Sequence, residues 1–287
     1  MAWAVVGSRG MFGSDMLKVL ESAGGQVVGL NRSNLDLANS VESLARAISG
    51  SEIVVNAVGY TRVDLAESEY ESAEYANVEV PGKLAEACLL AGSRLIHIST
   101  DYVFDGQSET PYLTSSQRNP SSVYGRTKLA GEDVVLGFKN TQVVRTAWLY
   151  GANGPCFPKS IAARLLSGDD IRVVDDQFGS PTNTMDLADF IVRIGSEPLI
   201  ERVLHGVSSG STSWFGFALE IAKALNISEG LVQPSSTANY PTQATRPAHS
   251  VLKPSSAGGH QIPHWQKAWW AHADQILTKS GITAWPT

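Results

Sequence analysis

The chain is organised around residues 94–128, which open with RLIHISTDYVFDG at 94–106 and close with PSSVYGRTK at 120–128. The apolar run 95–98 is short and is bounded by polar residues and glycine, which is typical of a fully buried strand. Because ligands of open α/β sheets bind just beyond the carboxyl ends of the strands, we expect Ser99 and Thr100 to lie at a functional site.

The second stretch predicts the start of a helix, on which Tyr124 and Lys128, four residues apart, share one face. A free phenol has a pKa of about 10. An ammonium about 4 Å away, at an effective dielectric of about 20, would stabilise the phenolate by about 4 kcal/mol, which lowers the pKa by about 3 units. We therefore expect Lys128 to lower the pKa of Tyr124 into the range of a general acid, with Thr100 bound to the same substrate oxygen. The alternative is that Tyr-x-x-x-Lys arises by chance on a helix.

The amino terminus carries a second motif, which concerns nucleotides. Residues 3–6 predict a short buried strand, and Gly7, Gly10 and Gly13 follow at the spacing G-x-x-G-x-x-G, before a helical pattern. Such glycines permit a tight turn, a closely bound pyrophosphate and close packing of helix on strand, and the helix amino terminus attracts the anion. The strand–glycine–helix order favours a dinucleotide-binding loop over a plain turn.

The second predicted strand, residues 26–30, indicates which dinucleotide is bound. An acidic residue at its end would bind a ribose 2′-hydroxyl, but here Asn31 and Arg32 follow the strand. Arg32 can pair with a 2′-phosphate, which favours NADPH without excluding NADH. A solvated surface arginine is the alternative.

Strand and helix alternate through residue 146, and this alternation predicts an α/β fold with a Rossmann-type, doubly wound parallel sheet. After that point Pro, Gly, Ser and Trp become frequent and the alternation ends. We expect a nucleotide-binding domain over residues 1–147 and a smaller, mixed substrate domain mainly over residues 148–287. Residues from about 183 to 205 are expected to return to the first domain.

The composition excludes several classes of protein. The 287 residues are 43% hydrophobic and 17% charged, which is enough apolar material for a large core, and the net charge of -6 gives no basic footprint for nucleic acid. Two cysteines make neither a disulfide framework nor a metal cluster. No apolar run reaches membrane-spanning length and the amino terminus lacks a basic leader, so we expect a soluble cytoplasmic protein without nucleic-acid or membrane partners.

Several sequence blocks give the chain a family resemblance. They are STDYVF at 99–104, VYG through GE at 123–132, RTAW at 145–148, DQFGSPT at 176–182, and YPT with RP at 240–247. On these blocks the chain resembles the extended short-chain dehydrogenase/reductases, and within them the dTDP-4-dehydrorhamnose reductase branch. The glycine loop and Tyr-x-x-x-Lys are shared by the whole superfamily, whereas STDYVF and DQFGSPT are specific to this branch.

The resemblance implies reduction of the 4-keto group of dTDP-4-dehydro-6-deoxy-L-mannose to dTDP-L-rhamnose. Nicotinamide C4 would deliver hydride, Tyr124 would protonate the carbonyl oxygen, Lys128 would hold the nicotinamide ribose, and Thr100 would bind the keto oxygen. The expected cofactor contacts are Gly7, Gly10, Met11, Phe12, Gly13, Asn31, Arg32, Asp36, Leu37, Ala57, Val58, Gly59, Ser99, Tyr124 and Lys128. The expected substrate contacts are Thr61, Val63, Thr100, Asp101, Tyr102, Tyr124, Trp148 and Arg246.

Three candidate residues have structural alternatives. Arg246, in a proline-punctuated loop, is either a phosphate clamp or a partner in an ion pair. Trp148 either packs on the sugar or belongs to the core. Asn77 either binds a water or a backbone carbonyl near Lys128, or is an exposed helix residue.

The chain departs from the family pattern in two places. It has Cys156-Phe157 where many relatives have Asn-Phe, which puts one contact to the nucleotide diphosphate in doubt. Some relatives dimerise through a magnesium ion held by acidic residues, and Asp15 stands at one such position, but the other ligands are not identifiable. We therefore expect a monomer or homodimer with no essential catalytic metal.

Four other functions compete with this interpretation. A 4,6-dehydratase would place Asp-Glu directly after the threonine, whereas here Thr100 is followed by Asp101 and Tyr102. A nucleotide-sugar epimerase uses the same Tyr and Lys but consumes no NADPH, and another dTDP-4-ketosugar reductase would differ only in the sugar. A non-catalytic, NADP-binding regulatory subunit is the alternative from another class.

Overall fold

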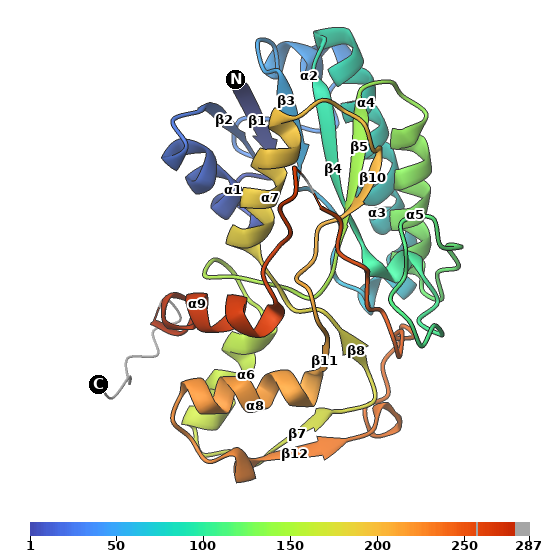
Figure 1. The fold of residues 1–287 in the computed structure, drawn as a ribbon. Helices are drawn as coiled ribbons and strands as arrows, with labels where there is room; N and C mark the ends of the chain where they lie inside the picture. The colour runs from blue at the N-terminus through green and yellow to red at the C-terminus, as the bar shows by residue number, and fades with distance from the viewer. Residues whose placement is uncertain (257, 279–287) are drawn as a thin grey trace.

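A six-stranded parallel sheet organises the amino-terminal part of the chain in the computed structural model, which describes residues 1–256 and 258–278 (Figure 1). The strand order is β10-β5-β4-β3-β1-β2. The strands are β1 (Ala2–Val6), β2 (Gln26–Leu30), β3 (Ile53–Asn56), β4 (Arg94–Thr100), β5 (Thr141–Thr146) and β10 (Val203–His205). The order reverses between β1 and β3, where a crevice forms at the carboxyl ends of the strands. The predicted Rossmann-type, doubly wound sheet is confirmed.

Helices cover both faces of this sheet because the strands are apolar on both sides. On one face, α1 (Met11–Ser22) packs beside α7 (Thr184–Ser196). On the other face lie α2 (Val41–Ala47), α4 (Val80–Ala91) and α5 (Val123–Leu136). Short elements connect β3 to α4 and β4 to α5, namely η1 (Leu65–Glu67), α3 (Tyr70–Glu74), η2 (Tyr75–Glu79, a π-helical turn) and η3 (Asp101–Val103).

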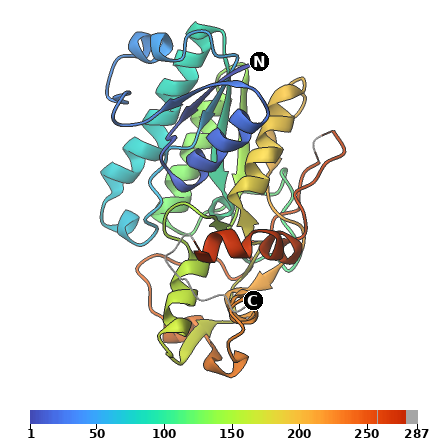
Figure 2. The same cartoon turned by 90° about the vertical axis from the view of Figure 1, so that its left-hand side faces the viewer.

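The later part of the chain forms a smaller body below the carboxyl ends of the strands. Its main elements are α6 (Phe157–Leu166), β7 (Ile171–Val174), α8 (Trp214–Ala224), β12 (Val232–Ser235) and α9 (Trp265–Thr278). Its short elements are β6 (Leu149–Tyr150), β8 (Phe178–Gly179), β9 (Thr182–Asn183), β11 (Thr212–Ser213), η4 (Glu229–Leu231) and η5 (Thr237–Asn239). Figures 1 and 2 show α9 between the sheet and α8.

The two parts exchange chain segments. After β7 the chain returns to the sheet, where α7 packs on α1 and β10 pairs with β5, and it then leaves again for α8. Residue 257 and residues 279–287, which fall within the expected substrate domain, lie outside the described residues. In the described part of the chain, no helix combines the length and apolar character that crossing a bilayer requires.

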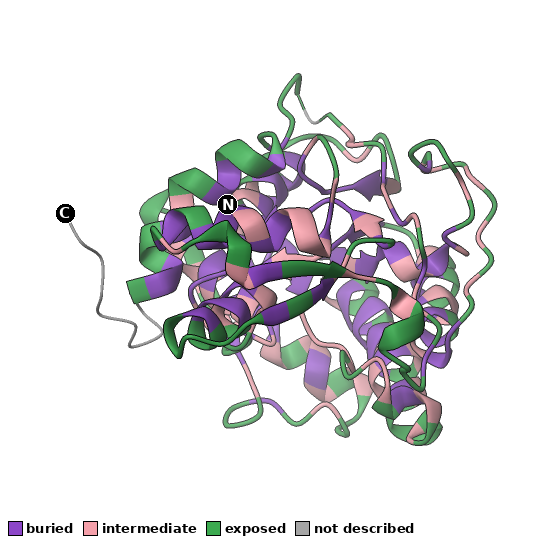
Figure 3. Ribbon diagram, turned by 90° about the horizontal axis from the view of Figure 1, so that it is seen from below, coloured by how far each residue is buried: buried purple, intermediate pink, exposed green. Residues whose placement is uncertain are grey.

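Burial follows the layers. Figure 3 shows buried residues along the strands and the inner faces of the helices, and exposed residues on the outer faces. Each part has its own apolar core, because one cluster of buried side chains joins α6, α8 and α9 while two others cover the two faces of the sheet.

A close backbone contact sets the distance between α5 and the π-helical turn η2. A Cβ atom on Gly131 would lie 1.9 Å from the carbonyl oxygen of Asn77 and 3.1 Å from its carbonyl carbon. Only glycine fits this approach, which fixes the helix that carries Tyr124 and Lys128.

We expect Gly131→Ala to lower the free energy of unfolding by about 1–3 kcal/mol, because the added methyl group meets backbone that cannot rotate away. The matched control is Gly82→Ala in α4, where the nearest atom to the new Cβ is Val134 Cγ1 at 2.8 Å, on an exposed side chain that can move. Urea denaturation of both variants measures the difference. Equal losses of stability would contradict the backbone contact as the cause.

Candidate active site

A cavity of about 650 Å³ lies at the carboxyl ends of the parallel strands, between the two parts of the chain. Many of the predicted site residues line it, namely Gly10, Met11, Phe12, Gly13, Ala57, Val58, Gly59, Thr61, Val63, Ser99, Thr100, Asp101, Tyr102, Tyr124, Lys128 and Trp148. Sequence reasoning missed other lining residues, namely Arg9, Ile98, Thr146, Ala147, Leu149, Gly154, Pro155 and Trp214. The position of Thr146 and Ala147 just at the end of a strand was a signal that could have found them.

The glycine loop joins β1 directly to α1. Gly7 adopts a φ of +88°, and its carbonyl oxygen accepts a hydrogen bond of 2.9 Å from the Gly10 N–H. A Cβ on Gly13 would lie 2.2 Å from the same carbonyl oxygen, so the first turn of α1 packs closely against the loop. The cavity therefore has the N–H groups of a helix amino terminus at one end, where an anion is stabilised.

Tyr124 and Lys128 are placed by the start of α5. The Ser122 hydroxyl caps this helix by accepting a hydrogen bond of 3.1 Å from the Gly125 N–H. The Lys128 ammonium is buried and donates a hydrogen bond of 2.7 Å to the Ile98 carbonyl oxygen in β4. Burial lowers the pKa of Lys128 to about 8, while the charge of Glu132 opposes the shift.

The expectation that Lys128 lowers the pKa of Tyr124 is wrong. The pKa of Tyr124 is raised to about 12, mainly by burial of the phenol. A hydrogen bond with Thr100 lowers the pKa in part, and the charge of Asp101 adds to the increase. The reason is that the Lys128 ammonium is directed to a backbone carbonyl and that loss of water outweighs the remaining attraction. Tyr124 is therefore protonated at neutral pH, the form that a proton donor requires.

The side chain of Thr100 lies beside a buried carboxyl group. Its hydroxyl donates a hydrogen bond of 3.0 Å to Asp101 Oδ1 and accepts one of 3.2 Å from the Tyr102 N–H. Burial raises the pKa of Asp101 to about 6, although hydrogen bonds oppose the shift. The Tyr102 ring meets the Tyr124 ring edge to face at 5.4 Å, so both phenols line one wall of the cavity.

Asn77 is buried and binds backbone, so the alternative of an exposed helix residue is wrong. Its amide accepts a hydrogen bond of 2.9 Å from the Tyr60 N–H and donates one of 3.3 Å to the Tyr60 carbonyl oxygen. It also donates one of 3.0 Å to the Thr127 hydroxyl. Asn77 thus ties the loop after β3 to α5.

Four of the expected cofactor contacts lie near the end of β2 and do not line the cavity. Asn31 donates a hydrogen bond of 3.3 Å to the Ser8 hydroxyl, and Arg32 is exposed to solvent. Asp36 accepts a hydrogen bond from the Ala38 N–H, and the Leu37 carbonyl oxygen accepts one from Lys83.

Arg246 lies beside the cavity lining and forms an ion pair. Its Nη2 donates a hydrogen bond of 2.5 Å to Asp64 Oδ2, and the Ala244 N–H donates one of 3.1 Å to the other carboxylate oxygen. Nη1 of Arg246 is buried and has no hydrogen-bond partner among the described residues. The ion pair joins the loop that carries Thr61 and Val63 to the later part of the chain.

Trp148 forms a wall of the cavity. Its ring stacks face to face on Trp214, with 3.5 Å between ring centroids and 2° between the planes, and its φ is +47°. Both rings line the cavity, and Phe157 packs against Trp214 at 4.6 Å.

Asp15, which stands at a position that holds an interface magnesium in some relatives, is fully buried in this chain. Its Oδ2 accepts a hydrogen bond of 2.6 Å from the Thr184 hydroxyl, and its Oδ1 accepts one of 2.8 Å from Asn153 and one of 3.3 Å from Lys18. Within residues 1–256 and 258–278, no three His, Cys, Asp or Glu side chains are grouped so that they could hold a metal ion. Asp15 instead joins α1 to the first residue of α7 and to the loop that lines the cavity at Gly154.

The fold and the Thr-Tyr-Lys arrangement beside a glycine loop define the class of the protein, an NAD(P)-dependent oxidoreductase of the short-chain dehydrogenase/reductase type. The chain belongs to the family described as the RmlD substrate binding domain, whose model matches residues 1–277. The resemblance found in the sequence is thereby confirmed.

Individual relatives match over most of their length. A Streptomyces griseus dTDP-4-dehydrorhamnose reductase is 38% identical over 277 residues, which cover 93% of this chain and 91% of that protein. A Streptomyces antibioticus protein named probable dTDP-4,6-dihydroxy-2-methyloxan-3-one 4-ketoreductase is 40% identical over 256 residues, 88% of this chain and 86% of its own. The crystal structure of Bacillus anthracis dTDP-4-dehydrorhamnose reductase in complex with NADP matches with a TM-score of 0.90 and 30% identity, over 96% of this chain and 99% of that chain.

We expect Asp15→Ala to lower the free energy of unfolding by about 1–3 kcal/mol, because the buried Thr184 hydroxyl loses its 2.6 Å hydrogen bond to a buried carboxylate. Lys18→Ala is the matched control, since it removes only a partly exposed ion pair worth less than about 1 kcal/mol. Thermal and urea unfolding measure both changes. A loss for Asp15→Ala no larger than for Lys18→Ala would contradict the internal role of this carboxylate.

Proposed function

We propose that the chain reduces the 4-keto group of dTDP-4-dehydro-6-deoxy-L-mannose to give dTDP-L-rhamnose, with NADPH as the preferred reductant and NADH as a second one. The observation that carries the proposal is that Thr100, Tyr124 and Lys128 line one cavity with the glycine loop. Membership of the RmlD family and a relative named dTDP-4-dehydrorhamnose reductase support the substrate.

The residues present fit a dinucleotide. The cavity runs from the amino terminus of α1, where Gly10 and Gly13 leave room for a pyrophosphate, to Lys128 and Tyr124 at its other end. The related Bacillus anthracis structure contains NADP. When bound, the nicotinamide supplies the hydride.

Each of the three catalytic residues has a separate role in this proposal. Tyr124, protonated at neutral pH, donates its proton to the oxygen that forms at sugar C4. Thr100 hydrogen-bonds the same oxygen and fixes its position. Lys128 holds the nicotinamide ribose.

The remaining predicted residues divide between cofactor and sugar. We assign cofactor contacts to the glycine loop, to the ends of β2, β3 and β4, and to residues 36 and 37. We assign substrate contacts to Thr61, Val63, Asp101, Tyr102 and Trp148. We assign Arg246 to the diphosphate of the substrate. The supporting observation is that its Nη1 is buried and has no hydrogen-bond partner among the described residues.

The proposal also covers the domain boundaries, the cellular location and the partners of the protein. Residues 1–147 with 183–205 form the nucleotide-binding domain, and residues 148–287 mainly form the sugar-binding domain. The protein acts in the cytoplasm, as a monomer or homodimer, without nucleic-acid or membrane partners and without an essential catalytic metal. The net charge of -6 supports the absence of a nucleic-acid partner.

A second candidate function is the reduction of another dTDP-linked 4-ketosugar. It is supported by the 40% identical Streptomyces antibioticus relative, whose name gives a different ketosugar. Incubating the purified protein with NADPH and a panel of dTDP-4-ketosugars separates the two candidates, by absorbance at the nicotinamide band and by analysis of the product sugar. Product epimerised without loss of NADPH would indicate an epimerase, and tight NADPH binding without any turnover would indicate a regulatory subunit.

We expect Tyr124→Phe to lower kcat by at least about 100-fold, because the proton donor is lost, while NADPH affinity changes little. Tyr75→Phe, which makes the same chemical change at an exposed residue outside the cavity lining, is the control and should retain full activity. Steady-state kinetics and NADPH fluorescence titration provide the measurements. Unaltered turnover in Tyr124→Phe would remove the proton-donor role.

We expect Arg32→Ala to weaken NADPH binding by about 10- to 100-fold, since a charge-assisted hydrogen bond to a phosphate contributes about 1.5–3 kcal/mol. Binding of NADH, which lacks the 2′-phosphate, should change little and serves as the internal control. Fluorescence titration with both cofactors gives the ratio. Equal losses for the two would show that Arg32 does not bind the 2′-phosphate.

A further inference from the structure

A buried carboxylate lies one helical turn beyond Lys128. Glu132, in α5, is 0% exposed, and the Ser99 hydroxyl donates a hydrogen bond of 2.5 Å to its Oε1. Arg145, in β5, donates to both oxygens, from Nε at 2.9 and 3.2 Å and from Nη2 at 2.8 Å. Glu132 thus connects α5 to the ends of β4 and β5.

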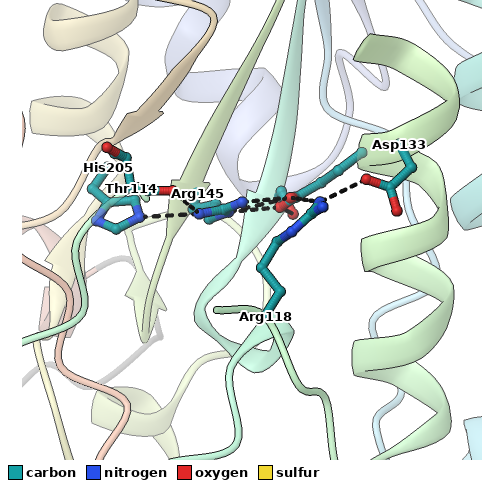
Figure 4. A network of polar contacts seen from close by, with 7 residues as sticks. Thr114, Arg118, Asp133, Arg145 and His205 are labelled. Carbon is teal, nitrogen blue, oxygen red and sulfur yellow. Dashed lines mark hydrogen bonds and ion pairs between the residues drawn. The ribbon is translucent and has the colours of Figure 1, made fainter. Parts of the chain in front are cut away.

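Arg145 is itself held on every side, as Figure 4 shows. Its Nη1 donates a hydrogen bond of 3.2 Å to the Thr114 carbonyl oxygen and lies 3.5 Å from His205 Nε2. Burial, with the charge of Arg145, lowers the pKa of His205 to about 4, so His205 is neutral and its Nε2 accepts from the guanidinium. The guanidinium carbon lies 5.1 Å from the centre of the Phe104 ring.

An outer arginine completes the network near the surface (Figure 4). Nη1 of Arg118 lies 3.5 Å from Glu132 Oε2 and 2.6 Å from Asp133 Oδ1. Asp133 follows Glu132 in sequence, but its side chain is half exposed on the outer side of α5. Two neighbouring acidic residues on one helix therefore face different environments.

Stability alone does not account for this network. A buried ion pair that is fully hydrogen-bonded commonly contributes little net stability compared with apolar residues of the same volume. The residues that Glu132 touches or faces, however, are the ones next to the reaction. Ser99 directly precedes Thr100, and Lys128 lies on the same helical face as Glu132.

The charged and titratable groups around Lys128 come from the strand β4, the short element η3 and the helix α5. Glu132, on its own helix, is the group whose charge stabilises the ammonium. His97, in β4, is buried and is held neutral by burial and by the charge of Lys128. Tyr124 is protonated at neutral pH, and Asp101 lies on the far side of Thr100. Among these groups, Glu132 is the one whose charge favours the ammonium form of Lys128.

We propose that Glu132 is a positioning residue for the reduction: it fixes the Ser99–Thr100 end of β4 by a direct hydrogen bond and supplies the negative charge that keeps Lys128 as an ammonium. Arg145 holds this carboxylate in place through its hydrogen bonds to both oxygens. The inference rests on the proposed reductase function, because the expected consequence is that the enzyme keeps its reductase activity at alkaline pH.

The test compares Glu132→Gln with Asp133→Asn, which removes the same charge from the adjacent residue on the outer side of the helix. With Glu132→Gln, the Lys128 pKa falls, so the decline of kcat/KM with rising pH should move to lower pH by about one unit or more. With Asp133→Asn, the profile should match that of the wild type. A folded Glu132→Gln variant with the wild-type pH profile would overturn the proposal.

Three further variants separate the roles and guard against misfolding. Glu132→Asp retains the charge, so its pH profile should stay near that of the wild type even where kcat falls. Ser99→Ala removes the hydrogen bond but leaves the ion pair, so kcat should fall without a shift in the profile. The double variant Glu132→Gln with Arg145→Gln leaves no unpaired buried charge and should show a smaller shift in the same direction as Glu132→Gln, because the cation that repels Lys128 is removed together with the carboxylate. An unshifted double variant, or a shifted Glu132→Asp, would contradict the proposal.

The wild-type protein keeps this test distinct from that of the proposed function. If wild-type protein does not reduce any 4-ketosugar, the proposed function fails. In that event the pH dependence of NADPH affinity, measured by fluorescence in wild type, Glu132→Gln and Asp133→Asn, still reports on Lys128. An unchanged pH dependence of affinity in Glu132→Gln would then overturn the role of Glu132.

Discussion

A hydrogen bond of 2.7 Å from the Lys128 ammonium to the Ile98 carbonyl oxygen holds α5 against the end of β4. These two elements carry Thr100, Tyr124 and Lys128, so their relative position decides whether a site exists. The bond lies within the amino-terminal part of the chain. The later part supplies other residues of the cavity lining, among them Trp148 and Trp214. The closely packed Gly131 and the buried Asn77 fix the same helix from its other side.

Burial moves the two ionisable groups of the site toward their uncharged forms. The pKa of Tyr124 rises to about 12 and that of Lys128 falls to about 8, and desolvation is the main cause of both shifts. For the phenol this shift agrees with the proton-donor role that we propose, since such a donor has to enter the reaction protonated. For the ammonium it is a cost, which the carboxylate of Glu132 offsets. The buried Lys128 thus has an internal counter-charge in Glu132, whereas no such cation is among the causes of the Tyr124 shift.

Local patterns in the sequence predicted the sheet and the residues nearest the reaction. The apolar run before Ser99, the glycine triplet and the Tyr-x-x-x-Lys spacing each depend on a few adjacent residues, and the structure has β4, α1 and α5 at these places. The two-domain boundaries and the roles of the site residues stay predictions.

The features that sequence reasoning missed depend on distant contacts or on burial. The Trp148–Trp214 stack and the Asp64–Arg246 pair join residues far apart in the chain, and no local pattern marks them. The contacts of Asp15 with Thr184 and Asn153 likewise join residues far apart in the chain, so the sequence around Asp15 does not reveal them. The direction of the Tyr124 shift was wrong because attraction to a nearby cation was weighed without the loss of hydration.

The return of α7 and β10 to the sheet has a consequence for how such a protein can diversify. A chain cut after β5 would lack the edge strand that pairs with β5 and the helix that packs on α1. The later part of the chain therefore cannot be exchanged by recombination as one continuous segment without also removing α7 and β10 from the sheet layer.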